Sequence, residues 1–179
     1  MQKVLACLVL LAAFTACQPS REKLNERITA TEKRLFSPNS SGFSKASADS
    51  LIADYELFVR EYPKDTLAPV YLFKGAGISM NMGEGGKAIE LYDRMISTYP
   101  DHPKAALALF FKGYVQENLL KDLDKAKETY LLFIEKYPNN EFTDDAQASI
   151  NNLGKSPEQM IREFEARKKA DSAAITGKK

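Results

Sequence analysis

The sequence predicts an all-α protein, a right-handed α-solenoid of about two to three helix-turn-helix repeats with a C-terminal capping helix. A phrase of the form Tyr-x-x-apolar-apolar-x-x-Tyr-Pro occurs three times, at residues 55–63, 92–100 and 130–138. A shorter phrase, Phe-Lys-Gly, occurs at residues 73–75 and again at 111–113. Both phrases return after 37 or 38 residues, and self-similarity at such a period indicates stacked structural repeats.

Each long phrase has the pattern of a helix that ends at a proline. Its apolar residues at i, i+3, i+4 and i+7 share one face of an α-helix. The residue before a proline is disfavoured in the α region, so the helix is expected to end there. Ala88 and Ala126 each precede a repeat tyrosine by four residues, and small side chains at these positions allow two helices to approach closely. Residues 83–86 and 120–124 are expected to be the turns within successive repeats.

The segments on either side of the repeats have patterns of their own. Residues 20–36 carry Leu24, Ile28 and Leu35 between charged residues, which favours a helix, with a stalk as one interpretation. Residues 37–42 are rich in Ser, Pro, Asn and Gly and predict a loop.

After the repeats, Gly154 is expected to stop one helix and Ser156 to cap the next, which begins at Pro157. The apolar residues of this last helix are Met160, Ile161 and Phe164. Because stacked repeats need a terminal cover, we expect the helix to cap the solenoid.

The N-terminus has the features of an export signal. Lys3 precedes an unbroken apolar run at residues 4–14. This run is shorter than the roughly 20 residues that a membrane-spanning helix needs, and it has the length of a secretory signal segment that is removed after export. Cys17 follows two small residues, Thr15 and Ala16.

Residues 14–17, Phe-Thr-Ala-Cys, resemble the lipobox of bacterial lipoproteins. The resemblance implies that the Cys17 thiol receives a diacylglyceryl group and that the chain is cut before this cysteine. Gln18 is compatible with transfer to the outer membrane in such lipoproteins. The alternative is that Cys17 is simply a cysteine near a cleavage site. Two or three acyl chains would hold the protein on a membrane, because each buried methylene contributes about 0.8 kcal/mol.

The repeats resemble the tetratricopeptide repeat (TPR), a helix-turn-helix of about 34 residues. The matching residues are Gly75, Ala88, Tyr92 and Pro100 in one unit and Gly113, Ala126, Tyr130 and Pro138 in the next. The longer variant that ends in Tyr-Pro is similar to the TPRs of two groups of Gram-negative envelope proteins. One is the periplasmic coordinator associated with the Tol–Pal system, and the other is the TPR lipoprotein of the outer-membrane β-barrel assembly machine.

The composition argues against several classes of function. Lys and Arg number 25 and Asp and Glu 24, a balance unlike the clustered basic charge of nucleic-acid-binding proteins. With 2 cysteines and 1 histidine, a metal site or a Cys/His catalytic pair is not expected. His102 lies in a predicted turn, and residues 83–86 lack the Lys-Ser/Thr of a phosphate-binding loop. We therefore expect no catalytic residues, no metal and no cofactor.

The resemblance to TPR proteins implies that the first helices of the repeats, at 68–82 and 105–120, line a concave groove. The candidate partner-binding residues there are Tyr71, Lys74, Phe110, Lys112 and Tyr114. Lys74 and Lys112 occupy equivalent positions and could be either solubilising surface residues or a repeated cationic feature that binds an acidic peptide or a carboxylate terminus.

The chain is thus expected to comprise a lipoprotein signal peptide (1–16), an N-terminal helix and linker (17–45), TPR-like repeats (46–154), a capping helix (155–170) and a disordered tail (171–179). The expected function is that of a periplasmic scaffold, anchored to the outer membrane through Cys17, that binds envelope proteins or peptides. Exposure at the cell surface is the alternative location. The narrower alternative function is an accessory role in β-barrel assembly or in Tol–Pal-linked envelope maintenance. No enzymatic activity is expected.

Overall fold

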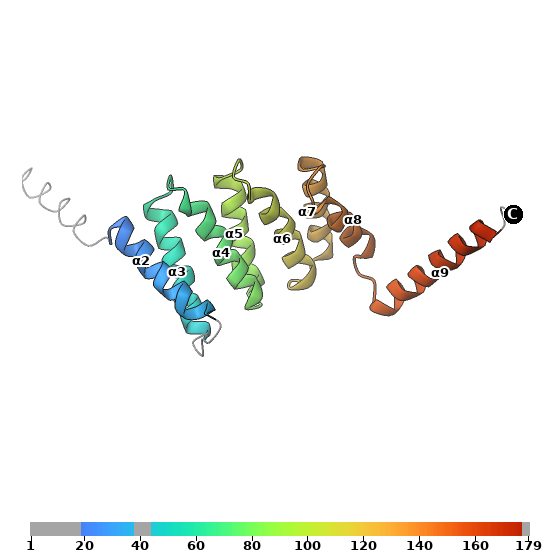
Figure 1. Cartoon of the computed structure of the whole chain (residues 1–179), viewed down its shortest axis with the longest axis horizontal. Helices are drawn as coiled ribbons and strands as arrows, with labels where there is room; N and C mark the ends of the chain where they lie inside the picture. The colour runs from blue at the N-terminus through green and yellow to red at the C-terminus, as the bar shows by residue number, and fades with distance from the viewer. Residues whose placement is uncertain (1–18, 38–43, 177–179) are drawn as a thin grey trace, which may run out of the picture. The chain divides into compact units, whose positions relative to one another are not determined.

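The computed structural model describes residues 19–37 and 44–176, and this part of the chain consists of α-helices and the turns between them. In chain order the helices are α2 (Arg21–Phe36), α3 (Lys45–Glu61), α4 (Leu67–Asn81), α5 (Gly85–Thr98), α6 (Ala105–Asn118), α7 (Leu123–Lys136), α8 (Thr143–Asn152) and α9 (Pro157–Thr176) (Figure 1). The predicted all-α repeat fold is confirmed. The expected signal peptide, Cys17 and most of the expected loop at 37–42 lie outside the described residues.

The chain divides into two compact units, one up to Ile78 and one from Ser79 onward, and each is described by itself. In the first unit α2 packs along α3 (Figure 1). Leu24 and Ile28 on α2 are fully buried, as are Leu51 and Phe58 on α3. The interpretation of α2 as a stalk is therefore wrong, and packed helices begin well before residue 46. Three widely spaced apolar residues are enough to bury one face of this helix.

In the second unit α5 packs against α6, α6 against α7 and α7 against α8. Part of its core forms around Phe110, Tyr130 and Phe133, with Ala126 and Ala146 fully buried between the helices. Ala88 is fully buried as well. The prediction that Ala88 and Ala126 are closely packed is thus consistent with their burial, since neither position exposes any side-chain surface.

The helices that carry the long phrase end where the prolines predict. The C-cap residues of α3, α5 and α7 are Tyr62, Tyr99 and Tyr137. Their N–H groups donate to the carbonyl oxygens of Phe58, Met95 and Phe133 at 2.8, 3.0 and 2.9 Å. Each helix is therefore closed by one final backbone hydrogen bond immediately before Pro63, Pro100 or Pro138.

Helix α9 differs from the expectation in two ways. It begins at Pro157 as predicted, with the Ser156 hydroxyl accepting from Gln159 N–H at 3.3 Å, but it continues to Thr176, so residues 171–176 are helical. Residues 157–176 contain no internal glycine or proline, and most are good helix formers. Its apolar residues Met160 and Phe164 are exposed, the latter by 66%.

The role of α9 as a cover for the array is therefore not supported by its packing. Helix α8 already presents a polar outer face, with Asp144, Asp145, Gln147 and Asn151 exposed. A terminal helix with a polar outer face ends a repeat array without a further cover. Among the described helices, none combines the length and apolar character that crossing a membrane requires.

Candidate partner-binding surface

Tyr71, on α4, is an interior residue of the first unit. Its side chain is only 4% exposed, and its ring stacks on Tyr55 with 4.9 Å between ring centroids. The rings of Tyr71 and Phe58 form a T-shaped pair, also with 4.9 Å between centroids. The Tyr71 hydroxyl donates a hydrogen bond to Asn25 Oδ1 on α2, and burial raises the pKa of Tyr71 to about 12. These contacts make Tyr71 a residue that joins α2, α3 and α4.

Lys74 lies one turn further along α4 and faces α2. Its Nζ donates to Glu32 Oε1 at 2.8 Å and lies 5.9 Å from the centroid of the Tyr71 ring, within cation–π range. The same Glu32 oxygen accepts from the Tyr55 hydroxyl at 2.6 Å. The ammonium group of Lys74 is thus engaged by the chain itself, although its side chain remains accessible from solvent.

Phe110, on α6, belongs to the core of the second unit. It is 8% exposed, and the ring centroids of Phe142, Phe133 and Tyr130 lie 5.0, 5.6 and 5.8 Å from its own. Phe110 therefore holds α6, α7 and the start of α8 together.

Lys112 and Tyr114 lie on the same helix as Phe110 but have different surroundings. Lys112 Nζ contacts Asp93 Oδ1 on α5 at 2.6 Å, so it links two successive helices. Tyr114 is 42% exposed. Of the five residues predicted to bind a partner, Tyr114 is thus the aromatic one that reaches solvent, while Tyr71 and Phe110 act through packing. Binding by Lys74, Lys112 and Tyr114 stays a prediction.

The exposed apolar residues of the described chain are concentrated in one region that the sequence reasoning missed. The large hydrophobic residues that reach solvent are Phe36 and then Tyr114, Leu119, Leu120, Leu123, Leu131, Leu132, Met160, Ile161 and Phe164. All except Phe36 lie between residues 114 and 164, in the second unit. They are distributed over α6, the α6–α7 turn, α7 and α9, and exposed apolar side chains mark interaction sites where they form a contiguous patch.

Leu131 and Leu132 on α7 are the most informative members of this set. They follow the repeat tyrosine Tyr130, just as Asp93 and Arg94 follow Tyr92 on α5. Leu131 is 49% exposed and Leu132 40%, so leucines occupy two solvent-facing positions that carry charges in the preceding repeat. Comparison of the two repeats position by position would have revealed this difference.

The replacement of charged residues by apolar ones between the two repeats extends to the neighbouring helix. Asp93 pairs with Lys112 on the next helix, and the residue 38 positions after Lys112 is Ile150 on α8. Ile150 is partly buried against the core of the second unit. At the place where one repeat has an Asp–Lys ion pair, the next repeat therefore has leucine and isoleucine.

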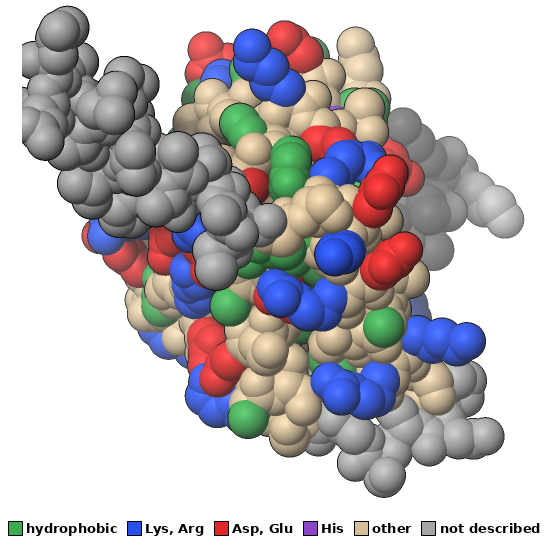
Figure 2. Space-filling model, turned by 90° about the vertical axis from the view of Figure 1, so that its left-hand side faces the viewer, with side chains coloured by type: hydrophobic (Ala, Val, Ile, Leu, Met, Phe, Trp, Pro, Cys, Tyr) green, Lys and Arg blue, Asp and Glu red, His purple; other side chains and the backbone are tan. Residues whose placement is uncertain are grey.

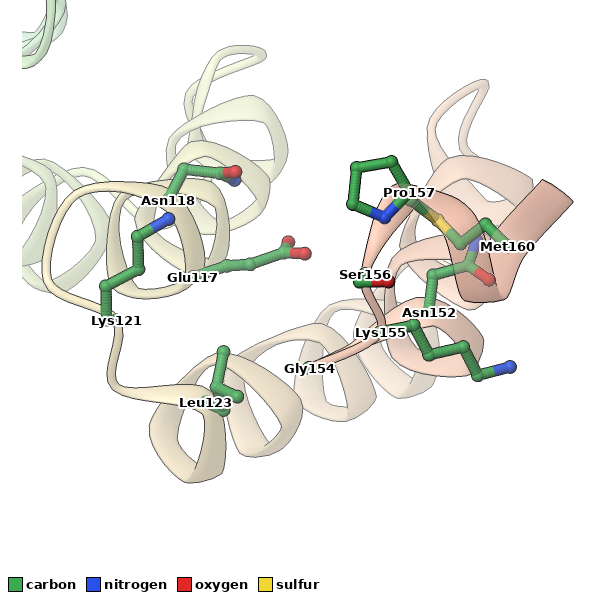
Figure 3. A pocket seen from close by; sticks show the side chains of 10 residues that line it. All are labelled: Glu117, Asn118, Lys121, Leu123, Asn152, Gly154, Lys155, Ser156, Pro157 and Met160. Carbon is green, nitrogen blue, oxygen red and sulfur yellow. The ribbon is translucent and has the colours of Figure 1, made fainter.

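A cavity of about 460 Å³ lies between the α6–α7 turn and the start of α9. Figure 3 shows Glu117, Asn118 and Lys121 on one side and Ser156, Pro157 and Met160 on the other. Glu117 accepts from the Tyr130 hydroxyl at 2.8 Å, and Lys155 on the rim pairs with Glu163 at 2.6 Å. Most of the residues that line the cavity are polar or charged, and they contain no acid/base pair poised on a common point.

The remaining candidates for chemistry have structural roles in the described part of the chain. His102 Nδ1 accepts from Lys104 N–H at 3.1 Å within the turn before α6. Within residues 19–37 and 44–176, no group of three or more His, Cys, Asp or Glu side chains is arranged to hold a metal ion. On the face that Figure 2 shows, Lys and Arg side chains are interspersed with Asp and Glu, and such mixed charge favours solubility.

Helices stacked on one another in chain order define a helical-repeat protein of the TPR type. A family model described as YfiO, outer membrane lipoprotein, matches residues 79–178, and the chain belongs to this family. The match covers the second unit and the residues between Tyr114 and Phe164. No curated protein matches the chain significantly. The predicted class, a bacterial TPR-type envelope lipoprotein, is thereby supported.

Proposed function

We propose that this protein is a lipid-anchored periplasmic scaffold that binds other envelope proteins through its second unit. The observation that carries the proposal is the concentration of exposed apolar side chains between Tyr114 and Phe164. Removing apolar surface from water is favourable by about 25 cal/mol per Å². A partner that covers these residues would therefore bind with a favourable hydrophobic contribution to the free energy of association. The proposal assigns no reaction to the chain.

The second unit offers a rigid support for such a partner. Leu131 and Leu132 directly follow Tyr130, which is fully buried, so their backbone is fixed by the core beneath them. Apolar side chains held on a rigid element lose little conformational freedom on binding, which lowers the entropic cost of association. The charged neighbours on the same helix, Lys127, Glu128 and Glu135, are exposed and form a polar rim of the kind that surrounds interface cores.

Cys17 is the proposed site of the lipid anchor. Membership of an outer membrane lipoprotein family supports an acylated cysteine, and Cys17 is the cysteine that directly follows the apolar N-terminal run. Cys17→Ser should release the protein from the membrane fraction. If the variant sediments with membranes as fully as the unmodified sequence, the anchor is elsewhere.

A direct test of partner binding uses a photoreactive amino acid placed in living cells. At Leu131 it should form crosslinks with one or a few envelope proteins. The matched control is Asp93, the equivalent and equally exposed position of the preceding repeat. Crosslinks of equal yield and identity at both positions would contradict a binding surface on α7.

The narrower alternative, an accessory role in β-barrel assembly or in Tol–Pal-linked envelope maintenance, differs only in the partner. Its support is membership of an outer membrane lipoprotein family, which is consistent with an accessory role in β-barrel assembly. Mass spectrometry of the proteins crosslinked at position 131 distinguishes them, because the two systems have different components.

A further inference from the structure

The first described residue of the chain is already bonded to the folded unit. The carbonyl oxygen of Pro19 accepts a hydrogen bond from the Tyr62 hydroxyl at 3.1 Å. Tyr62 is the C-cap of α3, and its ring packs beside that of Phe58, with 5.3 Å between centroids. The segment that enters α2 is therefore held at the turn between α3 and α4.

A second contact two residues later fixes the same end of the helix pair. Arg21 Nε lies 2.5 Å from Asp65 Oδ2 in the α3–α4 turn, and Asp65 Oδ1 also accepts from Leu67 N–H at 2.9 Å. The hydrogen bond from Arg21 lowers the pKa of the Asp65 carboxyl. One turn further on, Leu24 is fully buried. From Pro19 onward the chain thus belongs to the first unit and is not a tether.

The distance from this point to the proposed anchor is set by covalent geometry. Cys17 precedes Pro19 by two residues, and a fully extended chain spans at most about 3.3–3.6 Å per residue. The Cα atom of Cys17 is therefore within roughly 7 Å of that of Pro19, which is less than the diameter of one helix, about 10 Å. A lipid on Cys17 enters the bilayer next to the α3–α4 turn.

We propose that the end of the first unit formed by residues 19–23 and 62–66, the anchor-proximal surface, lies against the phospholipid headgroups of the leaflet that holds the Cys17 acyl chains. This inference rests on the proposed lipid anchor. Lys23 and Lys64 are exposed on this surface beside Glu22, and lysines near a membrane interact favourably with anionic headgroups. The acyl chains supply the affinity, and the short connection supplies the orientation.

The orientation has a consequence for the opposite end of the same helix pair. Arg34, near the C-terminus of α2, is 13 residues from Arg21, which corresponds to about 20 Å along a helix. With the anchor-proximal surface on the membrane, the end of the pair at Arg34 and Lys45 points away from the lipid. The first unit thus has one orientation relative to the bilayer.

The test uses lipidated protein bound to vesicles of phosphatidylethanolamine and phosphatidylglycerol. The mature chain has no cysteine besides the acylated Cys17, so Lys64→Cys and Arg34→Cys each create one thiol for a fluorescent label. Both residues are exposed, and circular dichroism verifies that both variants fold. With nitroxide-headgroup lipids in the vesicles, the label at 64 should lose most of its emission, whereas the label at 34 should keep most of it.

A matched variant separates the short connection from general affinity for lipid. A Gly/Ser segment of about 12 residues inserted between Gln18 and Pro19 spans roughly 20 Å and should abolish the difference between the two labels while flotation with vesicles is retained. Equal quenching at 64 and 34 without the insertion, or a difference that survives it, overturns the inference alone. Failure of the lipidated protein to float overturns the proposed anchor, and the inference with it.

Discussion

Gly113 on α6 lies against the ring of Tyr130 on α7, and the contact leaves no space for a side chain on the glycine. A Cβ atom at position 113 would be 2.7 Å from Tyr130 Cε1 and 2.8 Å from Cδ1. The two residues come from the two phrases that define the repeat, Phe-Lys-Gly and Tyr-x-x-apolar-apolar-x-x-Tyr-Pro. The packing of the Tyr130 ring against α6 therefore requires a glycine at position 113.

Gly113→Ala should lower the free energy of unfolding by about 1–3 kcal/mol, the usual cost of overpacking a core. The control is Gly77→Ala within α4, where an added Cβ meets open space and alanine should stabilise the helix by roughly 0.5–1 kcal/mol. Urea unfolding followed by circular dichroism measures both. Equal effects of the two substitutions would show that the contact with Tyr130 does not constrain position 113.

Ala126→Leu should also destabilise the protein by roughly 1–3 kcal/mol, because Ala126 is fully buried between helices and the larger side chain must displace its neighbours. Ala148→Leu on α8 is the matched control, since Ala148 is exposed. Thermal unfolding of both variants checks the prediction. A melting temperature of Ala126→Leu as high as that of the control would contradict the close packing.

The features of the fold that follow local rules could be predicted from the sequence. The ends of α3, α5 and α7 depend on a proline and the residue before it, and the start of α9 depends on Ser156 and Pro157. Whether α2 is a stalk or a packed helix depended on tertiary contacts. The apolar residues Leu24 and Ile28 are compatible with either. The exposure of α9 could not be predicted either, because an apolar stripe does not say whether another element covers it.

The candidate site was less predictable for the same reason. The sequence identifies Tyr71 and Phe110 as aromatic residues on first helices, but aromatic type does not distinguish a core residue from a binding residue. The pairing of Lys74 with Glu32 joins residues 42 positions apart, which no local pattern reveals. Leu131 and Leu132, by contrast, depart from the charges of the preceding repeat, and that signal is present in the sequence.

Ile28→Ala should destabilise the first unit by about 2–5 kcal/mol, the range for removing a large aliphatic side chain from a core. The reason is that Ile28 is fully buried in the packing of α2. Glu26→Ala on the exposed side of the same helix should change the free energy of unfolding little. If both variants unfold like the original protein, α2 does not contribute to the folded core.

Stability should decline at alkaline pH because the repeat tyrosines are buried. Burial raises the pKa of Tyr92 above its ordinary value of 10.0, and burial with a hydrogen bond to a glutamate does the same for Tyr55 and Tyr130. The native state then holds the phenolic protons more tightly than the unfolded chain. This contribution to stability is complete below the ordinary pKa and is lost as pH rises toward the native value.

Tyr92→Phe should therefore reduce the slope with which the free energy of unfolding falls at high pH, since it removes one group with a raised pKa. Unfolding curves collected between about pH 8 and pH 11, on either side of the ordinary tyrosine pKa, provide the measurement. An unchanged slope would mean that Tyr92 does not release its proton on unfolding in this range.

The last prediction separates two candidate binding surfaces, the apolar residues of α7 and the paired lysines. Leu131→Asp with Leu132→Arg restores the charges that Asp93 and Arg94 supply in the preceding repeat. Because Leu131 is 49% and Leu132 40% exposed, the double variant should fold with little change in stability.

Burying a leucine side chain contributes about 1.5–3 kcal/mol, and 1.4 kcal/mol corresponds to a tenfold change in affinity. If α7 binds the partner, the leucine variant should therefore lose about tenfold or more in capture by the partner crosslinked at position 131.

Lys74→Glu with Lys112→Glu instead breaks the contacts with Glu32 and Asp93. Rim charges mainly affect the association rate and its salt dependence, so this variant should weaken capture modestly, and more at low salt, where charges are screened less. Co-purification of both variants over a range of salt concentrations makes the comparison. Full capture by the leucine variant together with loss of capture by the lysine variant would assign the binding surface to Lys74 and Lys112 instead of α7.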